Sequence, residues 1–401
     1  MDESPPRKAS RRVFQSHHPF DDITVESLKE VGSLKWTAFP DRLAAWVAEM
    51  DFGVAPPIAE ALHAAVDRGA FGYLPEADAR AMSEAYAAFS ADRYGWEVDP
   101  ADVHAFPDVI TALDVAIEHF SAPGSAIIVP TPAYMPFLTW PATQGRRVIQ
   151  VPLARDGEDW VYDLDALERA FADGGGLLVL CNPHNPIGKV LTRDEMAAIG
   201  EVVERHGARV FSDEIHAPLV YGERRHVPYA SVNETTAGHT LTATSASKAW
   251  NLPGLKAAQV IVSNAADRER WATDGRMWGH GASNLGVVAN TAAYAAGVDW
   301  LDDVLQYLDG NRRRLAELVA EHLPGVRYAA PEGTYLAWLE FAALDLPASP
   351  ADFFGERAGV TLTDGGMCGD VGTTAARLNF ATPRPILERI VAAMGEALRS
   401  R

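Results

Sequence analysis

The sequence is poor in cysteine, and it contains no long apolar run. Only two cysteines occur in 401 residues, Cys181 and Cys368, and neither stands in a metal-ligand or redox spacing. So few thiols indicate a reducing compartment, so we expect a cytoplasmic protein and no metal ion. No apolar run approaches the roughly 20 residues that a membrane-spanning helix needs. Residues 1–12 have no hydrophobic stretch, which argues against a secretory signal and is typical of a frayed tail.

Positive charge is also scarce. Acidic residues outnumber basic ones by 54 to 35, and the formal net charge is −19. This excess argues against a nucleic-acid partner, because no basic patch would offset the repulsion from phosphates. The glycine pattern G-x-G-x-x-G is missing after the first strand, which argues against a Rossmann oxidoreductase.

The middle of the chain alternates short apolar runs with helical patterns. Residues 126–129, 177–180 and 240–244 have the composition of buried strands, and residues 193–206 are typical of a helix between two such strands. This alternation predicts an α/β domain with a largely parallel sheet.

The alternation of apolar runs and helical patterns ends at about residue 300, where a long helical pattern begins. Two strand-like runs and a final amphipathic helix from Pro385 follow, which predicts a smaller α+β domain. We therefore expect three parts: an N-terminal tail and segment (1–55) that packs with the small domain, a large domain (56–300) and a small C-terminal domain (301–401). Within the first part, residues 43–52 are expected to form a strand or an extended segment.

Four polar residues fall where proposed strands of the large domain end. They are Tyr134, Asn185, Asp213 and Lys248. In open parallel sheets, ligands bind at the carboxyl edge of the strands. Four such residues at four strand ends are expected from a binding site rather than from chance loop composition.

Lys248 follows two spaced serines, Ser245 and Ser247. A lysine amine that can lose its proton forms a Schiff base with an aldehyde cofactor, and small hydroxyl residues beside it can hold a phosphate. The pattern suggests a lysine that carries pyridoxal phosphate (PLP). Taken alone, however, most lysines in such loops are merely solvated.

The other strand-end residues each have a functional and a structural interpretation. Asp213 suits a protonated pyridine nitrogen, or else a helix cap or a structural ion pair. Asn185, between two prolines, can donate to a ring hydroxyl or serve a tight turn. Tyr134 can stack on a cofactor ring or belong to the core.

Two further features are compatible with a ligand. A helix that starts near Val109 and Ile110 can offer its first amide groups to a phosphate, although such helix starts are common. Arg377 lies in a strand pattern and can bind a carboxylate with two hydrogen bonds, or else form a surface ion pair.

Together these residues resemble the fold-type I PLP enzymes of the class I/II aminotransferase superfamily, from about Phe20 onward. The likeness rests on four motifs in the family's order: 182–188 (NPHNPIG), 212–216 (SDEIH), 245–248 (SASK) and 376–379 (ARLN). Residues 46–52 (WVAEMDF), 71–73 (FGY), 212–220 (SDEIHAPLV) and 331–338 (PEGTYLAW) resemble the cystathionine β-lyase, or C–S lyase, branch.

The resemblance implies a large domain with a mostly parallel, seven-stranded type of sheet, a homodimer with shared active sites, and a role for each motif residue. Lys248 would bind PLP covalently, Arg377 would hold the substrate carboxylate, and Tyr73 would reach into the neighbouring subunit. The remaining cofactor contacts that it implies are Asp213, Asn185, Tyr134, His216, Ser245, Ser247, Val109, Ile110 and, as a cationic helper, Lys256.

The chain departs from the family pattern at several positions. His216 stands where many aminotransferases have tyrosine, and the lyase branch shares this histidine. Glu49 replaces the branch's usual aspartate, and Trp250 its usual phenylalanine. Trp250 and Met367 are expected near the substrate side, with core packing as the alternative for both.

The expected reaction is β-elimination, in which a C–S bond of cystathionine or another cysteine S-conjugate is cleaved to thiol, pyruvate and ammonia. Lys248 would act as the general base, with Tyr134 and Asp213 as further catalytic groups. An aminotransferase is the main alternative, since the same fold and cofactor serve both reactions. A regulator that binds PLP or a protein partner without catalysis is the second, and the intact Lys248, Asp213, Asn185 and Arg377 argue against it.

Overall fold

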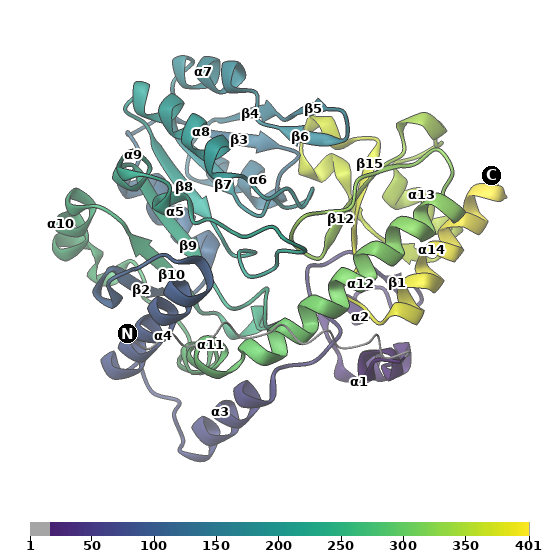
Figure 1. Cartoon of the computed structure of the whole chain (residues 1–401), viewed down its shortest axis with the longest axis horizontal. Coiled ribbons are helices and arrows are strands. Elements are labelled where there is room, and N and C mark those ends of the chain that lie inside the picture. The colour runs from purple at the N-terminus through teal and green to yellow at the C-terminus, as the bar shows by residue number, and fades with distance from the viewer. Residues whose placement is uncertain (1–16, 401) are drawn as a thin grey trace, which may run out of the picture.

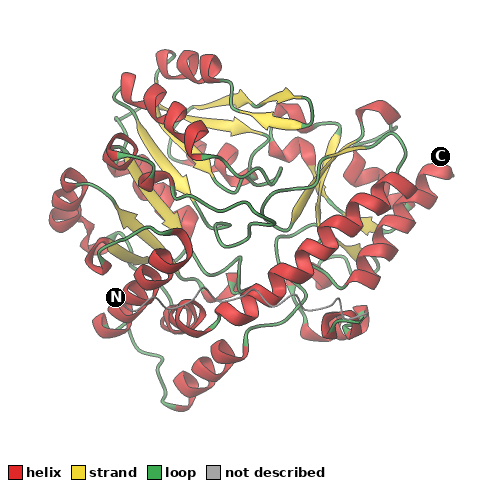
Figure 2. Cartoon of the chain, in the orientation of Figure 1, coloured by secondary structure: helices red, strands yellow, loops and turns green. Residues whose placement is uncertain are grey.

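A seven-stranded sheet organises the larger part of the molecule (Figures 1 and 2). The computed structural model describes residues 17–400. In spatial order the strands are β2 (Val103–Phe106), β10 (Ala258–Val262), β9 (Thr240–Thr244), β8 (Arg209–Asp213), β7 (Gly175–Cys181), β3 (Ala126–Thr131) and β4 (Val148–Pro152). Only β10 runs against its neighbours, β9 and β2. The predicted α/β fold with a mostly parallel sheet is confirmed.

Both faces of this sheet are buried, because successive strand residues point to opposite sides. On β7, Leu177 and Val179 join one apolar cluster, and Leu178 and Leu180 join another. Helices α5 (Val109–His119), α6 (Met135–Thr143) and α10 (Ala265–Asp274) supply the first cluster, while α7 (Leu164–Ala172) and α8 (Arg193–Arg205) supply the second. The strands therefore read as continuous apolar runs rather than as alternating ones.

The second sheet belongs to the C-terminal part and is antiparallel throughout. Its order is β11 (Arg327–Tyr328), β12 (Leu336–Glu340), β15 (Ala375–Asn379) and β14 (Thr363–Asp364). It is accompanied by α12 (Val298–His322), α13 (Pro350–Arg357) and α14 (Arg384–Arg399), which lie together in Figure 1. Ile386, Leu387 and Ile390 of α14 are buried, as expected from their helical spacing.

The N-terminal segment packs on this C-terminal part. Strand β1 (Leu43–Ala44) pairs in parallel with β13 (Val360–Thr361), and α1 (Val25–Val31) and α2 (Leu34–Thr37) precede it. Of the predicted extended stretch 43–52, only β1 is regular strand. Helices α3 (Pro56–Asp67), α4 (Glu76–Tyr94) and α11 (Asn284–Ala296) pack together, and a small hairpin is formed by β5 (Ala154–Asp156) and β6 (Asp159–Val161).

The division into parts at residues 55 and 300 stays a prediction. Residue 300 falls in the first turn of α12, so a boundary there would lie inside one continuous helix. The expected tail, residues 1–12, lies outside the described residues. Between His17 and Ser400, none of the helices combines the length and the apolar content that crossing a membrane requires.

One loop of the large sheet is fitted tightly against the C-terminal part. Gly188 has a φ of +70°, and a Cβ there would lie 2.2 Å from Pro331 Cβ and 2.8 Å from the Gly333 oxygen. Gly207 has a similar φ of +57° but open space around it. An alanine substitution at Gly207 therefore measures the cost of the backbone conformation alone, whereas the same substitution at Gly188 adds the cost of the close contact with Pro331 and Gly333.

We therefore expect Gly188→Ala to lower the free energy of unfolding more than Gly207→Ala does. The excess should be about 1–3 kcal/mol, the usual cost of overpacking. Urea unfolding of the two variants measures it. An equal loss in both would show that the loop moves away from Pro331 at no cost.

Candidate active site

The carboxyl edge of the large sheet gathers the charged residues that the sequence singles out. Asp213 is the last residue of β8, Lys248 lies four residues beyond β9, and Asn185 lies four residues beyond β7. Tyr134 is the N-cap of α6, just after β3. Because these strands are parallel, their ends meet at one edge. Electrostatic interactions of Lys248 and Tyr134 with Asp213 and Arg377 show that the group is compact.

Arg377 reaches this edge from the other sheet, on β15. Its Nη1 donates to Asn185 Oδ1 (3.1 Å), and its Nη2 donates to the Trp46 carbonyl (2.9 Å) and Thr363 Oγ1 (3.1 Å). The side chain is buried, and its Nε has no hydrogen-bond partner within the described residues. Burial lowers its pKa from the usual value, yet an arginine stays charged. The guanidinium is therefore fixed in place with one buried donor free for a carboxylate.

Lys248 is held by the backbone of the N-terminal segment. Its Nζ donates to the Ala48 carbonyl at 3.0 Å. Burial, together with the positive charge of Arg377, lowers its pKa to about 8, while the negative charges of Glu49 and Asp213 act in the opposite direction. A lysine with such a pKa carries a useful fraction of neutral, nucleophilic amine near neutral pH.

Asp213 is a buried carboxylate, and no cationic side chain between residues 17 and 400 forms an ion pair with it. Oδ1 accepts from the Ile215 amide at 3.0 Å, and Oδ2 contacts Cys181 Sγ at 3.8 Å. Burial raises its pKa to about 7. A cationic N–H group placed at Oδ2 would return the carboxyl group to its charged form.

The first turn of α5 lies at the same edge and could receive an anion. Val109 and Ile110 are its first two residues, and Asp108 is its N-cap, accepting from the Thr111 amide at 2.8 Å. Lys256 pairs with Asp108 at 2.8 Å, so this lysine brings positive charge to the helix N-terminus.

The two serines of the lysine loop differ in their hydrogen bonds. Ser245 Oγ donates to the Ala257 carbonyl (2.6 Å) and accepts from the Ser247 amide (3.0 Å). Its proton is therefore already committed to the loop. Ser245 shapes this turn, whereas Ser247 is only partly buried.

His216 lies close enough to Lys248 and Arg377 for their charges to act on it. It is 1% exposed, and its Nδ1 has no hydrogen-bond partner within the described residues. Burial lowers its pKa well below the usual value, and both cations lower it further. The ring is therefore neutral and keeps one nitrogen free to bond a ligand.

Two residues expected at the site lie elsewhere. Trp250 is completely buried, its ring packs against Phe89 and Tyr294, and its Nε1 donates to the Gly297 carbonyl at 2.9 Å. This position corrects the expectation that Trp250 faces the substrate, because core packing has taken up both the ring and its N–H. Tyr73 is 93% exposed and therefore does not pack into the site of its own chain.

Sequence reasoning missed several residues that hold the site. Tyr335 donates its hydroxyl proton to the same Ala48 carbonyl at 2.9 Å. His184, inside the 182–188 motif, contacts the Pro132 carbonyl and the Tyr162 hydroxyl, each at 2.8 Å. The motif itself was a signal for His184. Tyr335 likewise lies in the 331–338 run that resembles the lyase branch, although nothing in that run distinguished the tyrosine from its neighbours.

Comparison with known proteins agrees with this arrangement. The family model for aminotransferase class I and II matches residues 47–394, so the chain belongs to this family. The cystathionine β-lyase of Corynebacterium glutamicum is 45% identical over 365 residues, which cover 91% of this chain and 96% of that one.

Two solved structures share the fold over nearly the whole chain. A proposed PLP-dependent β-cystathionase from Corynebacterium diphtheriae has a TM-score of 0.89 and 38% identity, covering 94% of this chain and 98% of that one. Cystalysin from Treponema denticola, which contains PLP, has a TM-score of 0.86 and 28% identity, covering 93% and 97%. The family and the fold type expected from the sequence are thereby confirmed.

The raised pKa of Asp213 makes the stability of the cofactor-free protein depend on pH. The folded state holds this proton more tightly than the unfolded state, whose pKa is near the ordinary 3.8. The resulting stabilisation is complete below that value and is lost as pH rises through about 7.

Because Asp213→Asn cannot ionise, it should gain stability relative to the original chain as pH rises. The gain between about pH 5 and about pH 8 should approach, at most, about 3 kcal/mol. Thermal unfolding of both cofactor-free proteins across this range measures it. A difference that stays constant with pH would contradict the raised pKa.

Proposed function

We propose that this protein is a PLP-dependent carbon–sulfur β-lyase. It would cleave cystathionine or another cysteine S-conjugate into a thiol, pyruvate and ammonia. Membership of the class I and II aminotransferase family supports the cofactor, and 45% identity to a cystathionine β-lyase over most of both chains supports the reaction. The observation that carries the proposal is a half-buried lysine of lowered pKa close to a buried arginine with a free donor.

The residues at the sheet edge fit PLP. Asp213 needs a cationic N–H, which a protonated pyridine ring has. Asn185 accepts from Arg377 through Oδ1, so its Nδ2 is oriented away from that bond and can donate to the ring hydroxyl. The first amide groups of α5 suit the phosphate, Lys256 is paired with the α5 N-cap Asp108, and Ser247 would add a hydroxyl group. Tyr134 and His216 would complete the cofactor contacts.

PLP, when bound, supplies an aldehyde that condenses with amines and a cationic ring that withdraws electrons from the substrate's Cα. The chain supplies position and proton transfer. Arg377 would bind the α-carboxylate through its free Nε and would orient the Cα–H bond toward Lys248. Asp213 would keep the ring nitrogen protonated. His216, being neutral, can bond without adding charge.

In the elimination, the Lys248 amine removes the Cα proton, and the electron pair of that bond forms a Cα–Cβ double bond as the Cβ–S bond breaks. The sulfur leaves as a thiolate and takes up a proton. The three-carbon fragment is hydrolysed to pyruvate and ammonia. No external oxidant or oxo-acid is needed, which separates this reaction from transamination.

The active enzyme would be a homodimer with shared active sites. Tyr73 and Phe71 are 93% and 67% exposed and line a surface cavity of about 980 Å³ together with Arg80, His280 and Asn284. Exposed aromatic residues beside a large hollow suit a second copy of the chain. Tyr73 would then reach the phosphate in the partner.

The two buried free cysteines agree with a cytoplasmic location.

The reaction is tested with purified protein, PLP, L-cystathionine and several S-alkyl cysteines, without any oxo-acid. We expect pyruvate and thiol in equal amounts, and Lys248→Ala should lower the rate at least about a hundredfold. Without pyruvate, a change of near-visible absorbance on adding an amino acid, reversed by an oxo-acid, would identify an aminotransferase instead. A yellow protein that no amino acid alters would point to a regulator.

Shared sites predict complementation between two inactive variants. Lys248→Ala and Tyr73→Ala would each be nearly inactive alone, but a mixed dimer would contain one intact site. The purified mixed dimer has one intact site of two, so about half of the original activity per dimer should return. Co-expression with two different tags and purification through both isolates the mixed dimer. Activity no higher than that of either parent would exclude a shared site.

A further inference from the structure

A short stretch before α3, the 46–51 segment, is held almost entirely by side chains. Five successive carbonyls, from Trp46 to Met50, each accept a side-chain hydrogen bond. The stretch has no regular strand or helix. Buried carbonyls must find donors, and here side chains from distant parts of the chain provide them.

The carbonyls alternate between two sides. Those of Trp46 and Ala48 face the candidate active site, where they accept from Arg377 Nη2 (2.9 Å) and Lys248 Nζ (3.0 Å). The carbonyls of Val47 and Glu49 both accept from Asn379 Nδ2, each at 2.7 Å. Asn379 fixes the Val47 and Glu49 carbonyls on the side away from the site. The positions of the neighbouring Trp46 and Ala48 carbonyls, which face the site, depend on this anchoring.

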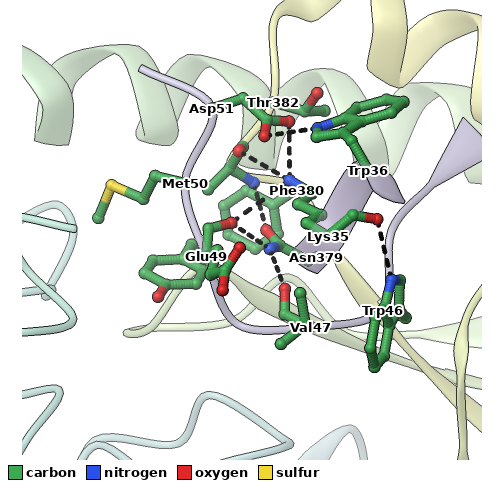
Figure 3. A network of polar contacts seen from close by, with 12 residues as sticks. Lys35, Trp36, Trp46, Val47, Glu49, Met50, Asp51, Asn379, Phe380 and Thr382 are labelled. Atoms are coloured by element: carbon green, nitrogen blue, oxygen red, sulfur yellow. Dashed lines mark hydrogen bonds and ion pairs between the residues drawn. The ribbon is translucent and has the colours of Figure 1, made fainter. Parts of the chain in front are cut away.

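Lys35 is the second donor behind the segment (Figure 3). Its Nζ donates to Asp51 Oδ2 (2.7 Å), to the Glu49 carbonyl (3.3 Å) and to the Ala381 carbonyl (3.3 Å). All three protons of an ammonium group therefore have an acceptor. Trp36 Nε1 donates to the other oxygen, Asp51 Oδ1, at 2.8 Å.

This ion pair is fully buried, with side-chain exposures of 0% for Lys35 and 2% for Asp51. Burying two charges costs desolvation, and apolar residues of similar size often give equal stability. A buried ion pair is therefore weak evidence for a purely stabilising role. What the ion pair adds is directional hydrogen bonding, because each bond fixes the position of one acceptor atom, such as the Glu49 carbonyl oxygen.

We propose that Lys35 and Asp51, which lie outside the candidate active site, position the Trp46 and Ala48 carbonyls that hold the Arg377 guanidinium and the Lys248 amine. Lys35 and Asp51 are positioning residues, because they act through the 46–51 segment. The inference that this affects a substrate carboxylate rests on the proposed function. Loss of the pair would let the segment shift and would misplace Arg377 more than it disturbs the cofactor contacts at the sheet edge.

The test uses a double variant, Lys35→Met with Asp51→Asn, in the PLP-loaded protein. This change removes both charges together, keeps similar volumes, and leaves an oxygen to accept from Trp36. The probe is L-alanine, which has the α-carboxylate but no leaving group. Its binding is followed by near-visible absorbance, and the KM and kcat for S-methyl-L-cysteine are measured beside it.

We expect binding of L-alanine to weaken about tenfold and KM to rise by a similar factor, with a smaller change in kcat. Affinity for PLP should change much less than L-alanine binding, because most of the proposed PLP contacts lie at the edge of the large sheet and do not bond to the 46–51 segment. The matched control is Arg209→Met with Asp267→Asn. It removes a partly buried ion pair at the other end of β8, remote from the carbonyls. The control should leave L-alanine binding unchanged.

Asn379→Leu provides a second variant in case the double variant does not fold. It removes both bonds from Asn379 Nδ2 to the same segment and should weaken L-alanine binding in the same direction. The proposal is overturned if these variants lower the melting temperature but leave L-alanine binding and KM unchanged, or if the control alters them equally. If the original protein binds L-alanine but forms no pyruvate from any substrate, only the lyase function is refuted.

Discussion

Irregular backbone buried between two sheets needs hydrogen-bond donors, and this requirement governs how the candidate site is built. Among the described residues, no strand pairs with the 46–51 segment through its backbone amide groups. Lys248 and Asn251 supply donors from the large sheet's side, and Arg377 and Asn379 supply them from the small sheet. The residues that satisfy this backbone thus include those to which the chemistry is assigned. Fold stability and site geometry therefore depend on the same hydrogen bonds.

Burial then sets the charge states. The same loss of solvation raises the pKa of Asp213 to about 7 and lowers that of Lys248 to about 8. Both pKa values therefore lie close to neutral pH, where each group can gain or lose a proton at little cost in free energy. His216 goes further and stays neutral. The low-dielectric setting thus prepares an acid, a base and a neutral donor or acceptor from ordinary residue types.

The sequence was most informative where chemistry demands special residues in short motifs. Lys248, Asp213, Asn185 and Arg377 were predicted from such motifs, and the structure brings them to one edge of the large sheet. The large sheet followed from its apolar runs, because buried parallel strands need them. Trp250 was misplaced, since an indole at a loop looks the same whether it faces a ligand or the core. Lys35 and Asp51 were missed altogether, because nothing local distinguishes a buried pair 16 positions apart from two solvated charges.

The hydrogen bond between Arg377 and the Trp46 carbonyl joins positions 331 residues apart. During synthesis, the Trp46 carbonyl therefore cannot gain this donor until the following 331 residues have been made. The large sheet is complete by residue 262 and can form earlier, whereas β15 follows only after residue 374. A ribosome-bound chain of that length would thus hold a nearly finished sheet but not Arg377, the arginine proposed to bind the carboxylate. Under the proposed function, substrate binding would become available only after β15 has been made, so products truncated before it would lack this binding even if their larger part folded.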